Sequence, residues 1–486
     1  MQTAEAVGPA EPRSIDHVRT GVLGLDDILS GGLPQGRATL VCGGPGCGKS
    51  LLALEVLARG AAQFDEPGVL MLFEETAQEA IENAAAIGLD LQPLIDAGTL
   101  AIDHVELRRD RIEQTGDFDL EGLFVRLGLA IDSTGAKRVV LDTIETLFST
   151  FDDSALLRAE LQRLFRWLKD RGVTALITAE RGEGALTRHG LEEYVSDCVI
   201  LLDHRVTEQM ATRRLRVVKF RGSAHGTSEF PFLIDERGFS VLPVTSLDLD
   251  HVASDEVVST GIDSLDAMLG RGGLYRGSTT MVSGASGTGK TTIAGHVAGA
   301  SCGRGERTLL LAFEESPSQI TRNLRSVGLD LQPHVDAGLL VIDAGRPSQF
   351  GLESHLLRLY QHLEEHRPTV VVIDPITDFK SQGTSLDIKA MLMRMVDLLK
   401  RRGVTALFTS ISMDGADEET AVSSLIDTWI QLRTTEVASR RGGALYVLKA
   451  RGMSHSHSVR TLTISDTGVH LTPAADDTDQ EGADRG

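Results

Sequence analysis

Two stretches of the sequence decide the fold: GGPGCGKS at residues 43–50 and GASGTGKT at residues 284–291. Both follow the pattern GxxxxGK[ST], and each comes after a short apolar run and before a segment with helical spacing of apolar residues. In this context the glycines let successive backbone N–H groups point at phosphate oxygens. The sequence therefore predicts two phosphate-binding loops, each between a strand and a helix.

The two loops belong to an internal repeat. TGVLGLD at 20–26 returns as TGIDSLD at 260–266, and GLDLQP at 88–93 returns unchanged at 328–333. In both copies short apolar runs alternate with longer amphipathic segments, which is typical of a mainly parallel sheet flanked by helices. We therefore predict an α/β protein with two tandem P-loop domains, produced by duplication of one domain.

The repeat also predicts the domain boundaries. We expect a disordered N-terminus at 1–13, a first domain at 14–246, a polar linker at 247–256, a second domain at 257–472 and an acidic, disordered tail at 473–486. A chain of 486 residues is long enough for two such domains.

Composition excludes several classes of protein. The chain has 69 Asp and Glu against 48 Lys and Arg, a formal charge of −21, which argues against a protein that coats nucleic acid. No apolar run is long enough to span a membrane, and no secretory signal is visible. The four cysteines have no zinc-ligand spacing, so we expect a reduced, cytoplasmic setting. These cysteines are Cys42, Cys47, Cys198 and Cys302.

The loops and the residues beside them are the candidate nucleotide-binding residues. They are Gly43, Gly44, Gly46, Cys47, Gly48, Lys49, Ser50 and Leu51 in the first copy, and Gly284, Ser286, Gly287, Thr288, Gly289, Lys290, Thr291 and Thr292 in the second. Lys49 and Lys290 would reach the β- and γ-phosphates of ATP. Cys47 occupies a variable loop position. Its oxidation could block the site, but the position favours a tolerated small residue.

An acidic residue ends a later apolar run in each copy. RVVLD ends in Asp142 and VVVID ends in Asp374. With the loop hydroxyls of Ser50 and Thr291, these carboxylates are candidates to hold Mg²⁺. An aspartate in a turn after a strand is the alternative, and the presence of a phosphate loop in both copies favours the metal.

A pair of glutamates follows another apolar run: Glu74 and Glu75 in the first copy, Glu314 and Glu315 in the second. One carboxylate of each pair could activate a water or a hydroxyl beside the γ-phosphate. Acids that stabilise the N-terminus of a helix are the alternative. Recurrence of FEE[TS] favours a catalytic role.

A basic pair appears late in each copy, as Lys219 and Arg221 in KFRG and as Lys449 and Arg451 in KARG. Alternate residues of a strand lie on one face, so each pair would share a face. These side chains are either exposed solubilising charges or cations that reach a phosphoryl group. The pattern by itself favours the former.

Taken together, the loops, the FEE[TS] strings, the strand-end aspartates and the K-x-RG strings resemble the KaiC family of RecA-like ATPases, from about Ile15 to Leu471. The resemblance implies two RecA-like domains in a homo-hexamer of two stacked rings, with ATP between neighbouring subunits. It implies slow ATP hydrolysis in the first domain and serine/threonine autokinase activity in the second. The K-x-R pairs would then reach the neighbour's γ-phosphate, and Glu74 and Glu314 would be the leading bases.

The resemblance also points to phosphoacceptors. When the copies are aligned on Asp197 and Asp427, only the second carries adjacent hydroxyls, Ser423 and Ser424, where the family has a phosphorylated Ser-Thr pair. We expect both serines to be autophosphorylated. A plain pair of turn serines is the alternative.

Partner proteins follow less directly. Clock members of the family carry a longer C-terminal extension that binds KaiA, whereas about fifteen residues follow Leu471 here, so we expect no KaiA-type regulation. A KaiB-like partner fits the family-like segment Glu106–Leu123, which is equally well read as a surface loop.

Two other classes of function remain open. A RecA/RadA-type recombinase or helicase would use the same core on single-stranded DNA, although the acidic balance and 4% aromatics weigh against a stacking channel. A nucleotide-bound scaffold without turnover would not need both glutamate pairs.

Overall fold

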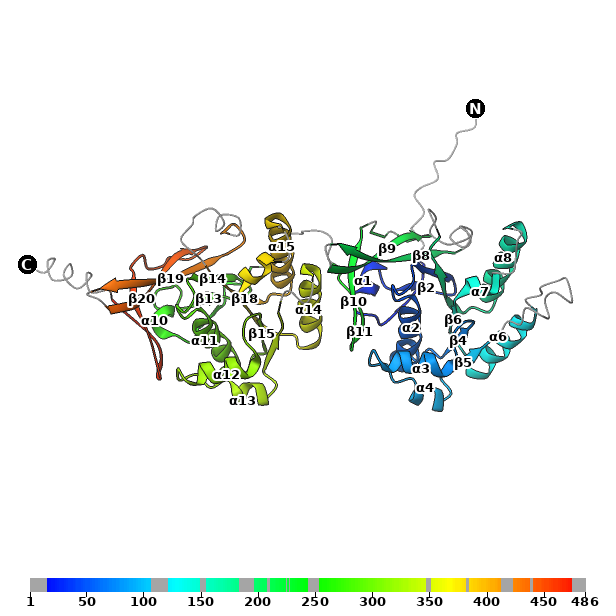
Figure 1. Ribbon diagram of the computed structural model, residues 1–486, viewed down its shortest axis with the longest axis horizontal. Coiled ribbons are helices and arrows are strands. Elements are labelled where there is room, and N and C mark those ends of the chain that lie inside the picture. The colour runs from blue at the N-terminus through cyan, green and yellow to red at the C-terminus, as the bar shows by residue number, and fades with distance from the viewer. Residues whose placement is uncertain are drawn as a thin grey trace, which may run out of the picture. The chain divides into compact units, whose positions relative to one another are not determined.

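A computed structural model describes most of the chain (Figure 1). The described residues are 15–105, 121–148, 154–182, 196–207, 210–223, 225–226, 228–243, 253–346, 351–381, 384–411, 423–437 and 440–473. The chain divides into two compact units, Met1–Thr245 and Ser246–Gly486. The predicted linker and tail boundaries stay predictions.

The first unit is built on a large mixed sheet, whose described strands number nine in the order β11-β10-β9-β8-β3-β7-β6-β4-β5. The six strands from β8 to β5 are parallel, and β9, β10 and β11 continue the sheet antiparallel. The strands are β3 Ala38–Gly43, β4 Gly68–Leu72, β5 Leu100–His104, β6 Arg138–Asp142, β7 Thr174–Glu180, β8 Cys198–Thr207, β9 Met210–Phe220, β10 Phe230–Asp235 and β11 Gly238–Val241. A short pair, β1 His17–Val18 and β2 Leu33–Pro34, stands apart.

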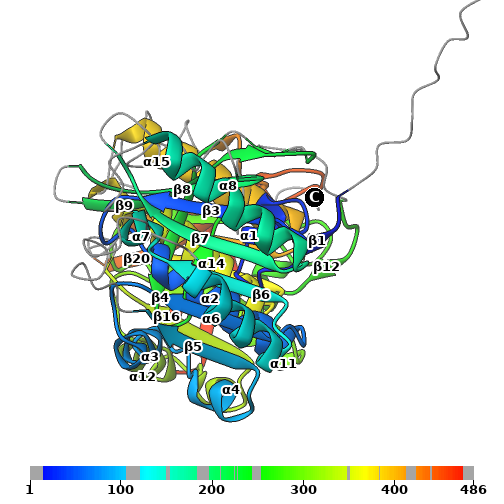
Figure 2. The same cartoon turned by 90° about the vertical axis from the view of Figure 1, so that its right-hand side faces the viewer.

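Helices cover both faces of this sheet. The helices are α1 Leu25–Ile28, α2 Lys49–Gln63, α3 Ala77–Ala85, α4 Gln92–Asp96, α6 Glu121–Thr134, α7 Ile144–Phe148 and α8 Ser154–Asp170. One core packs α2 and α3 against one face, and a second core packs α6 and α8 against the other, as Figure 2 shows for α6 and α8. Because both faces are covered, β3, β4 and β6 are buried along their whole length and consist mostly of apolar residues.

The second unit repeats this plan, with nine described strands in the order β16-β15-β17-β18-β14-β19-β20-β21-β22. The strands are β14 Thr279–Gly284, β15 Thr308–Ala312, β16 Leu340–Ala344, β17 Val370–Asp374, β18 Thr405–Ile411, β19 Thr428–Val437, β20 Arg440–Ala450, β21 Arg460–Ser465 and β22 Gly468–Pro473, with the short pair β12 Val257–Val258 and β13 Leu274–Tyr275. The helices are α10 Asp263–Asp266, α11 Lys290–Gly303, α12 Pro317–Arg325, α13 Gln332–Asp336, α14 Leu352–Glu365, the 3-10 helix η2 Ile376–Ser381 and α15 Ser385–Arg401. The expectation of two mainly parallel α/β domains is thus confirmed.

The parallel strands give each sheet two different edges. At the carboxyl edge β3 and β14 lead into the phosphate loops, and β6 and β17 end in Asp142 and Asp374. Ligands of open α/β sheets bind at this edge. At the opposite edge β19 begins, and its antiparallel neighbour β20 ends beside it, so Lys449 lies opposite Trp429 there.

Candidate functional site

Each glycine-rich loop turns directly into a helix. Gly48 precedes α2 with φ 100°, and Gly289 precedes α11 with φ 96°, a left-handed conformation that glycine adopts without a side-chain clash. The helix N-terminus leaves backbone N–H groups that favour an anion. Both loops are therefore built as sequence analysis predicts for phosphate binding.

The loop lysines are buried and folded back on their own loops. Lys49 Nζ donates to the carbonyls of Gly43 and Gly44, both at 3.1 Å. In the second unit Lys290 Nζ donates to the carbonyls of Gly284 and Ala285 at 2.9 and 2.8 Å. Burial lowers the pKa of Lys290, and the carboxylates of nearby acids counter that shift. A cation so placed can contact an anion cradled by the loop.

Each loop hydroxyl lies against the strand-end aspartate. Thr291 Oγ1 donates to Asp374 Oδ2 at 2.7 Å, and Thr409 donates to the other carboxylate oxygen. In the first unit burial raises the pKa of Asp142, an effect countered by hydrogen bonds from Thr178 and Ser50. The same arrangement of hydroxyl and carboxylate thus occurs twice.

These oxygens fit Mg²⁺, which takes one or two carboxylates in such sites and completes its shell with phosphate oxygens and water. Among the described residues no group of three or more His, Cys, Asp or Glu side chains could hold a metal ion by itself. A site of this kind would need the phosphates to complete it.

The two glutamates of each pair face different surroundings. Glu74 accepts a 2.6 Å hydrogen bond from Thr146 Oγ1 of α7, which follows Asp142. Glu75 instead accepts from Asn83 of α3 at 3.0 Å. Glu74 is thus bonded to α7 and Glu75 to α3, and burial, followed by the carboxylate of Asp142, raises the pKa of Glu75.

In the second unit the second glutamate is again bonded to an asparagine of the next helix, but the raised pKa belongs to the first glutamate. Glu315 accepts from Asn323 of α12 at 3.2 Å, and burial, followed by the carboxylates of Asp378 and Asp374, raises the pKa of Glu314. Thr76 and Ser316 cap the helices that follow the pairs. Because the caps stabilise those helix ends, the glutamates are not required for that purpose.

The basic pair of the second unit contacts the candidate acceptor segment. Lys449 Nζ donates to the carbonyls of Ser423 and Ile426, each at 2.7 Å, and Arg451 Nη1 donates to the Ser424 carbonyl at 2.9 Å. Ser423 is half-buried and Ser424 is exposed. Residues 412–422, including Glu418 and Glu419, lie outside the described residues.

The corresponding pair of the first unit occupies the same place in its sheet. Lys219 lies opposite Val199, and the backbone N–H of Arg221 donates to the Asp197 carbonyl at 2.9 Å. Residues 193–195, which align with the acceptor position, and most of the segment Glu106–Leu123 are outside the described residues.

The candidate acceptor serines and the phosphate loop of the same unit lie at opposite edges of the sheet. Thr279, which bonds the acceptor segment, begins β14, whereas the loop follows Gly284 at its other end. Six strand residues separate the two by roughly 17 Å. The structure thus brings Lys290, Thr291, Asp374 and Glu314 together, but it does not bring Ser423 or Ser424 to them within one chain.

Two residues near the candidate bases Glu74 and Glu314 were not predicted from the sequence. Thr146 and Asp378 stand four residues after Asp142 and Asp374, at equivalent positions of the repeat. Burial and the carboxylate of Asp374 raise the pKa of Asp378. Aligning the copies at this position would have shown that a hydroxyl in one site is a carboxylate in the other.

Comparison with known proteins agrees with this geometry. The model of the family "ATPase: KaiC" matches residues 18–246 and 258–476. The chain belongs to the KaiC family. Circadian clock protein KaiC2 of Synechocystis sp. is 51% identical over 460 residues, which are 94% of this chain and 81% of that protein. Circadian clock oscillator protein KaiC of Synechococcus elongatus is 36% identical over 480 residues, 97% of this chain and 92% of that protein.

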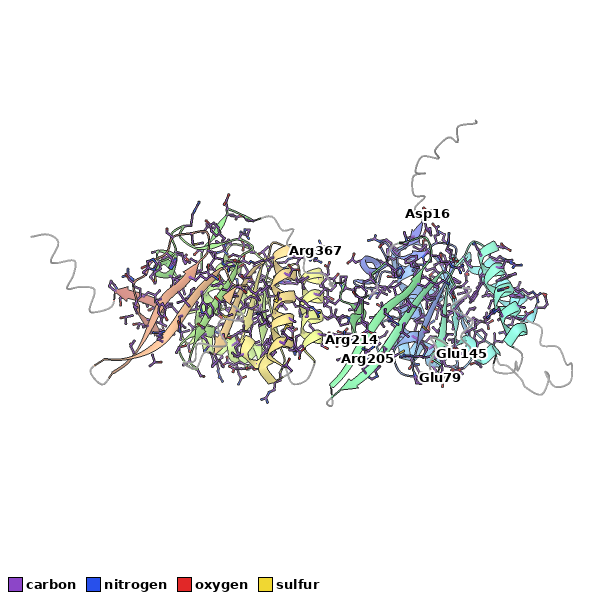
Figure 3. The ribbon with its side chains drawn as sticks, turned by 90° about the horizontal axis from the view of Figure 1, so that it is seen from above. Asp16, Glu79, Glu145, Arg205, Arg214 and Arg367 are labelled. Atoms are coloured by element: carbon purple, nitrogen blue, oxygen red, sulfur yellow. The ribbon has the colours of Figure 1, made fainter. Side chains whose placement is uncertain are left out.

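Membership of the KaiC family does not favour the DNA-dependent alternative, and the charges agree. Arg205 and Arg214 lie on the β8-β9 hairpin (Figure 3), but Arg205 pairs with Asp203 at 2.7 Å and with Glu229 at 2.8 Å. The hydrogen bond from Arg205 lowers the pKa of Glu229. These cations are neutralised within the unit.

The four cysteines of this KaiC-family chain are buried thiols that form no disulfide. Burial raises the pKa of the Cys47 thiol, which disfavours the thiolate that oxidants attack. Among the described residues, no helix has the length and apolar character needed to cross a membrane.

Proposed function

We propose that this KaiC-family ATPase binds Mg-ATP at both loops, hydrolyses it slowly in the first domain, and phosphorylates its own serines in the second. The observation that carries the proposal is the contact of Thr291 Oγ1 with Asp374, 2.7 Å, beside a loop lysine at a helix N-terminus. Its counterpart in the first unit joins Ser50 to Asp142. Both sites have the parts that phosphoryl transfer from ATP needs.

Metal and nucleotide would be held by separate groups. Ser50 with Asp142, and Thr291 with Asp374, would hold Mg²⁺, whose charge helps neutralise the phosphates. The loop N–H groups and the lysines Lys49 and Lys290 would bind the phosphates themselves.

In the first domain the attacking group is water. Glu74 is the leading base, and Thr146 orients it through the 2.6 Å hydrogen bond. Glu75, bonded to Asn83, supports the site. Water adds to the γ-phosphorus, its proton passes to Glu74, and the bond to the ADP oxygen breaks.

In the second domain the attacking group is a serine hydroxyl. The oxygen of Ser423 or Ser424 forms a bond to the γ-phosphorus, its proton passes to Glu314, and ADP leaves with the electrons of the broken P–O bond. Glu315 supports Glu314. Because the pKa of Glu314 is raised, its carboxylate is a stronger proton acceptor than that of an ordinary glutamate.

Separation of the acceptor serines from their own loop supports transfer between subunits. We infer a homo-hexamer in which one subunit's serines meet the neighbour's ATP, with Lys219, Arg221, Lys449 and Arg451 close to the neighbour's γ-phosphate. The relatives are named as circadian clock proteins. By analogy this chain would act as a phosphorylation-state switch in a clock or in signalling, with a KaiB-like partner, in the cytoplasm.

Intact-mass analysis over time with Mg-ATP tests the proposal. We expect up to two phosphates per chain, both absent from a variant with Ser423→Ala and Ser424→Ala. Glu74→Gln should reduce hydrolysis while leaving phosphorylation in place, and Glu314→Gln should do the reverse. Wild-type protein that gains no phosphate would refute the kinase activity but not the ATPase activity, which release of inorganic phosphate reports separately.

A further inference from the structure

The acceptor segment 423–427 is held by its main-chain carbonyls. Lys449 binds the carbonyls of residues 423 and 426, and Arg451 binds that of residue 424. Between these, the Leu425 carbonyl accepts a 2.9 Å hydrogen bond from Thr279 Oγ1. Four successive carbonyls therefore have partners from two strands that lie on either side of β19 in the sheet.

Asp427 anchors the end of this segment. Its Oδ2 accepts from the backbone N–H of Thr279 at 2.9 Å and pairs with Lys400 Nζ at 2.8 Å. The Thr279 hydroxyl also lies 2.9 Å from this oxygen and shares its single proton between Asp427 and the Leu425 carbonyl. The backbone N–H of Asp427 in turn donates to the Thr279 carbonyl at 2.9 Å. Burial alone would raise the pKa of Asp427, but Lys400 and Thr279 outweigh it and hold the pKa below its ordinary value.

The hydroxyl at the centre of these contacts belongs to the second copy alone. Aligned on the phosphate loops, Thr279 corresponds to Ala38 in the first copy, which has no hydroxyl. There Asp197 is paired instead with Arg37, at 3.4 Å. The copy with two adjacent serines is thus also the copy with a threonine hydroxyl in contact with the segment that carries them.

We propose that Thr279 is a positioning residue for phosphoryl transfer, because its hydroxyl fixes the Leu425 carbonyl and the Asp427 carboxylate and thereby sets where the acceptor hydroxyls stand. The inference rests on the proposed autokinase function. The Thr279 hydroxyl contacts Leu425 and Asp427 rather than the serine hydroxyls, so it would act through the segment. Removal of the Thr279 hydroxyl leaves the phosphate loop, Asp374 and Glu314 intact.

Thr280 provides a matched control. Both threonines are fully buried in β14, but the Thr280 hydroxyl has no hydrogen-bond partner within the described structure. Replacing either by valine keeps the shape and β-branching of the side chain. Only Thr279→Val removes bonds to the acceptor segment.

The experiment compares full-length wild type, Thr279→Val, Thr279→Ser and Thr280→Val by single-turnover phosphorylation with Mg-ATP. We expect Thr279→Val to slow phosphorylation about tenfold at saturating ATP, because small displacements of reacting groups are costly. The ATP concentration for half-maximal rate should stay unchanged. Thr279→Ser, which keeps the hydroxyl, should recover most of the rate, and Thr280→Val should match wild type.

Hydrogen exchange of the amides in residues 423–427, without any phosphorylation, gives an independent measurement. Faster exchange in Thr279→Val than in Thr280→Val supports the inference. Equal exchange, or equal phosphorylation rates of Thr279→Val and wild type, would overturn it. If wild type gains no phosphate, the proposed kinase function fails, and the exchange comparison still decides whether Thr279 holds the segment.

Discussion

Lys449 donates to the backbone carbonyl of Ser423 at 2.7 Å, at the edge of the sheet opposite the chain's own phosphate loop. Through this contact the basic pair and the candidate acceptors lie together at one edge of the sheet. Any nucleotide that Lys449 and Arg451 contact would lie close to these serines. This arrangement supports the proposed transfer from the nucleotide of another subunit.

Mixing two variants tests transfer between subunits. Lys290→Ala has intact serines but a disabled second loop, and the double variant with Ser423→Ala and Ser424→Ala has the loop without acceptors. We expect phosphate on the Lys290→Ala chains after the two are mixed under conditions of subunit exchange, as resolved by mass spectrometry. If transfer occurred only within a chain, the Lys290→Ala chains would gain no phosphate in the mixture. Lys290→Ala protein incubated without the second variant is the control for residual activity of its own loop.

The two glutamates of the second unit should differ in importance. Glu314 lies near the carboxylates of Asp378 and Asp374, whereas Glu315 is bonded to Asn323 of α12. We expect Glu314→Gln to slow phosphorylation by about 10²-fold or more, the usual range for loss of a general base, and Glu315→Gln to have a smaller effect. Phosphate incorporation at saturating ATP measures both; a larger effect of Glu315→Gln would reverse the assignment.

Asp378 should set the acid limb of the phosphorylation profile. A base is active when deprotonated, so activity is lost as pH falls through its pKa, and a raised pKa moves that loss to higher pH. Burial first, and then Asp378, raises the pKa of Glu314. In the first copy the equivalent position is Thr146, so Asp378→Thr replaces the carboxylate with the residue of the other copy. This change should shift the acid limb of the pH–rate profile to lower pH. An unchanged or higher midpoint contradicts this coupling.

The contact of Thr291 with Asp374, 2.7 Å, should matter for magnesium more than for folding. Thr291→Val removes an oxygen that would ligand Mg²⁺ while preserving side-chain shape. We expect the Mg²⁺ concentration for half-maximal phosphorylation to rise several-fold and Thr291→Ser to restore it. A matching loss in thermal stability would point to a structural role instead.

Glu306 should stabilise the second unit at neutral pH. Burial opposes its ionisation, but hydrogen bonds from Arg276, Arg304 and Ser301 lower its pKa to about 2. A carboxylate whose pKa is lowered in the folded state stabilises that state at pH values above its ordinary pKa of 4.5. This stabilisation disappears as pH falls from 4.5 toward 2. Glu306→Gln should cost about 1 kcal/mol at pH 7, allowing for solvent screening.

Thermal unfolding of Glu306→Gln and wild type at pH 7 and at low pH measures this difference. The control is Glu256→Gln: Glu256 pairs with the same Arg276 at 2.9 Å but is 59% exposed, so its loss should cost less. A difference between wild type and Glu306→Gln that grew on acidification would contradict the assignment.

Local patterns in the sequence were enough to predict several features. The two GxxxxGK[ST] strings, the apolar runs that became β3, β6, β14 and β17, and the duplication itself depend on residue spacing within short windows. Such spacing reflects the backbone that a few neighbouring residues must adopt. The double α/β architecture and the family follow from the same patterns.

Tertiary structure decided which of the candidate residues meet. Thr279 and Asp427 are 148 residues apart in the sequence, and they touch because β14 and β19 are neighbours in the sheet. Strand order likewise places Lys449 beside Ser423 and away from Lys290. Sequence spacing determined what each segment is. The packing of strands across the sheet determined that Asp374 and Asp378 lie near Glu314. It also determined that the candidate acceptor serines lie an entire strand length from the phosphate loop of their own chain.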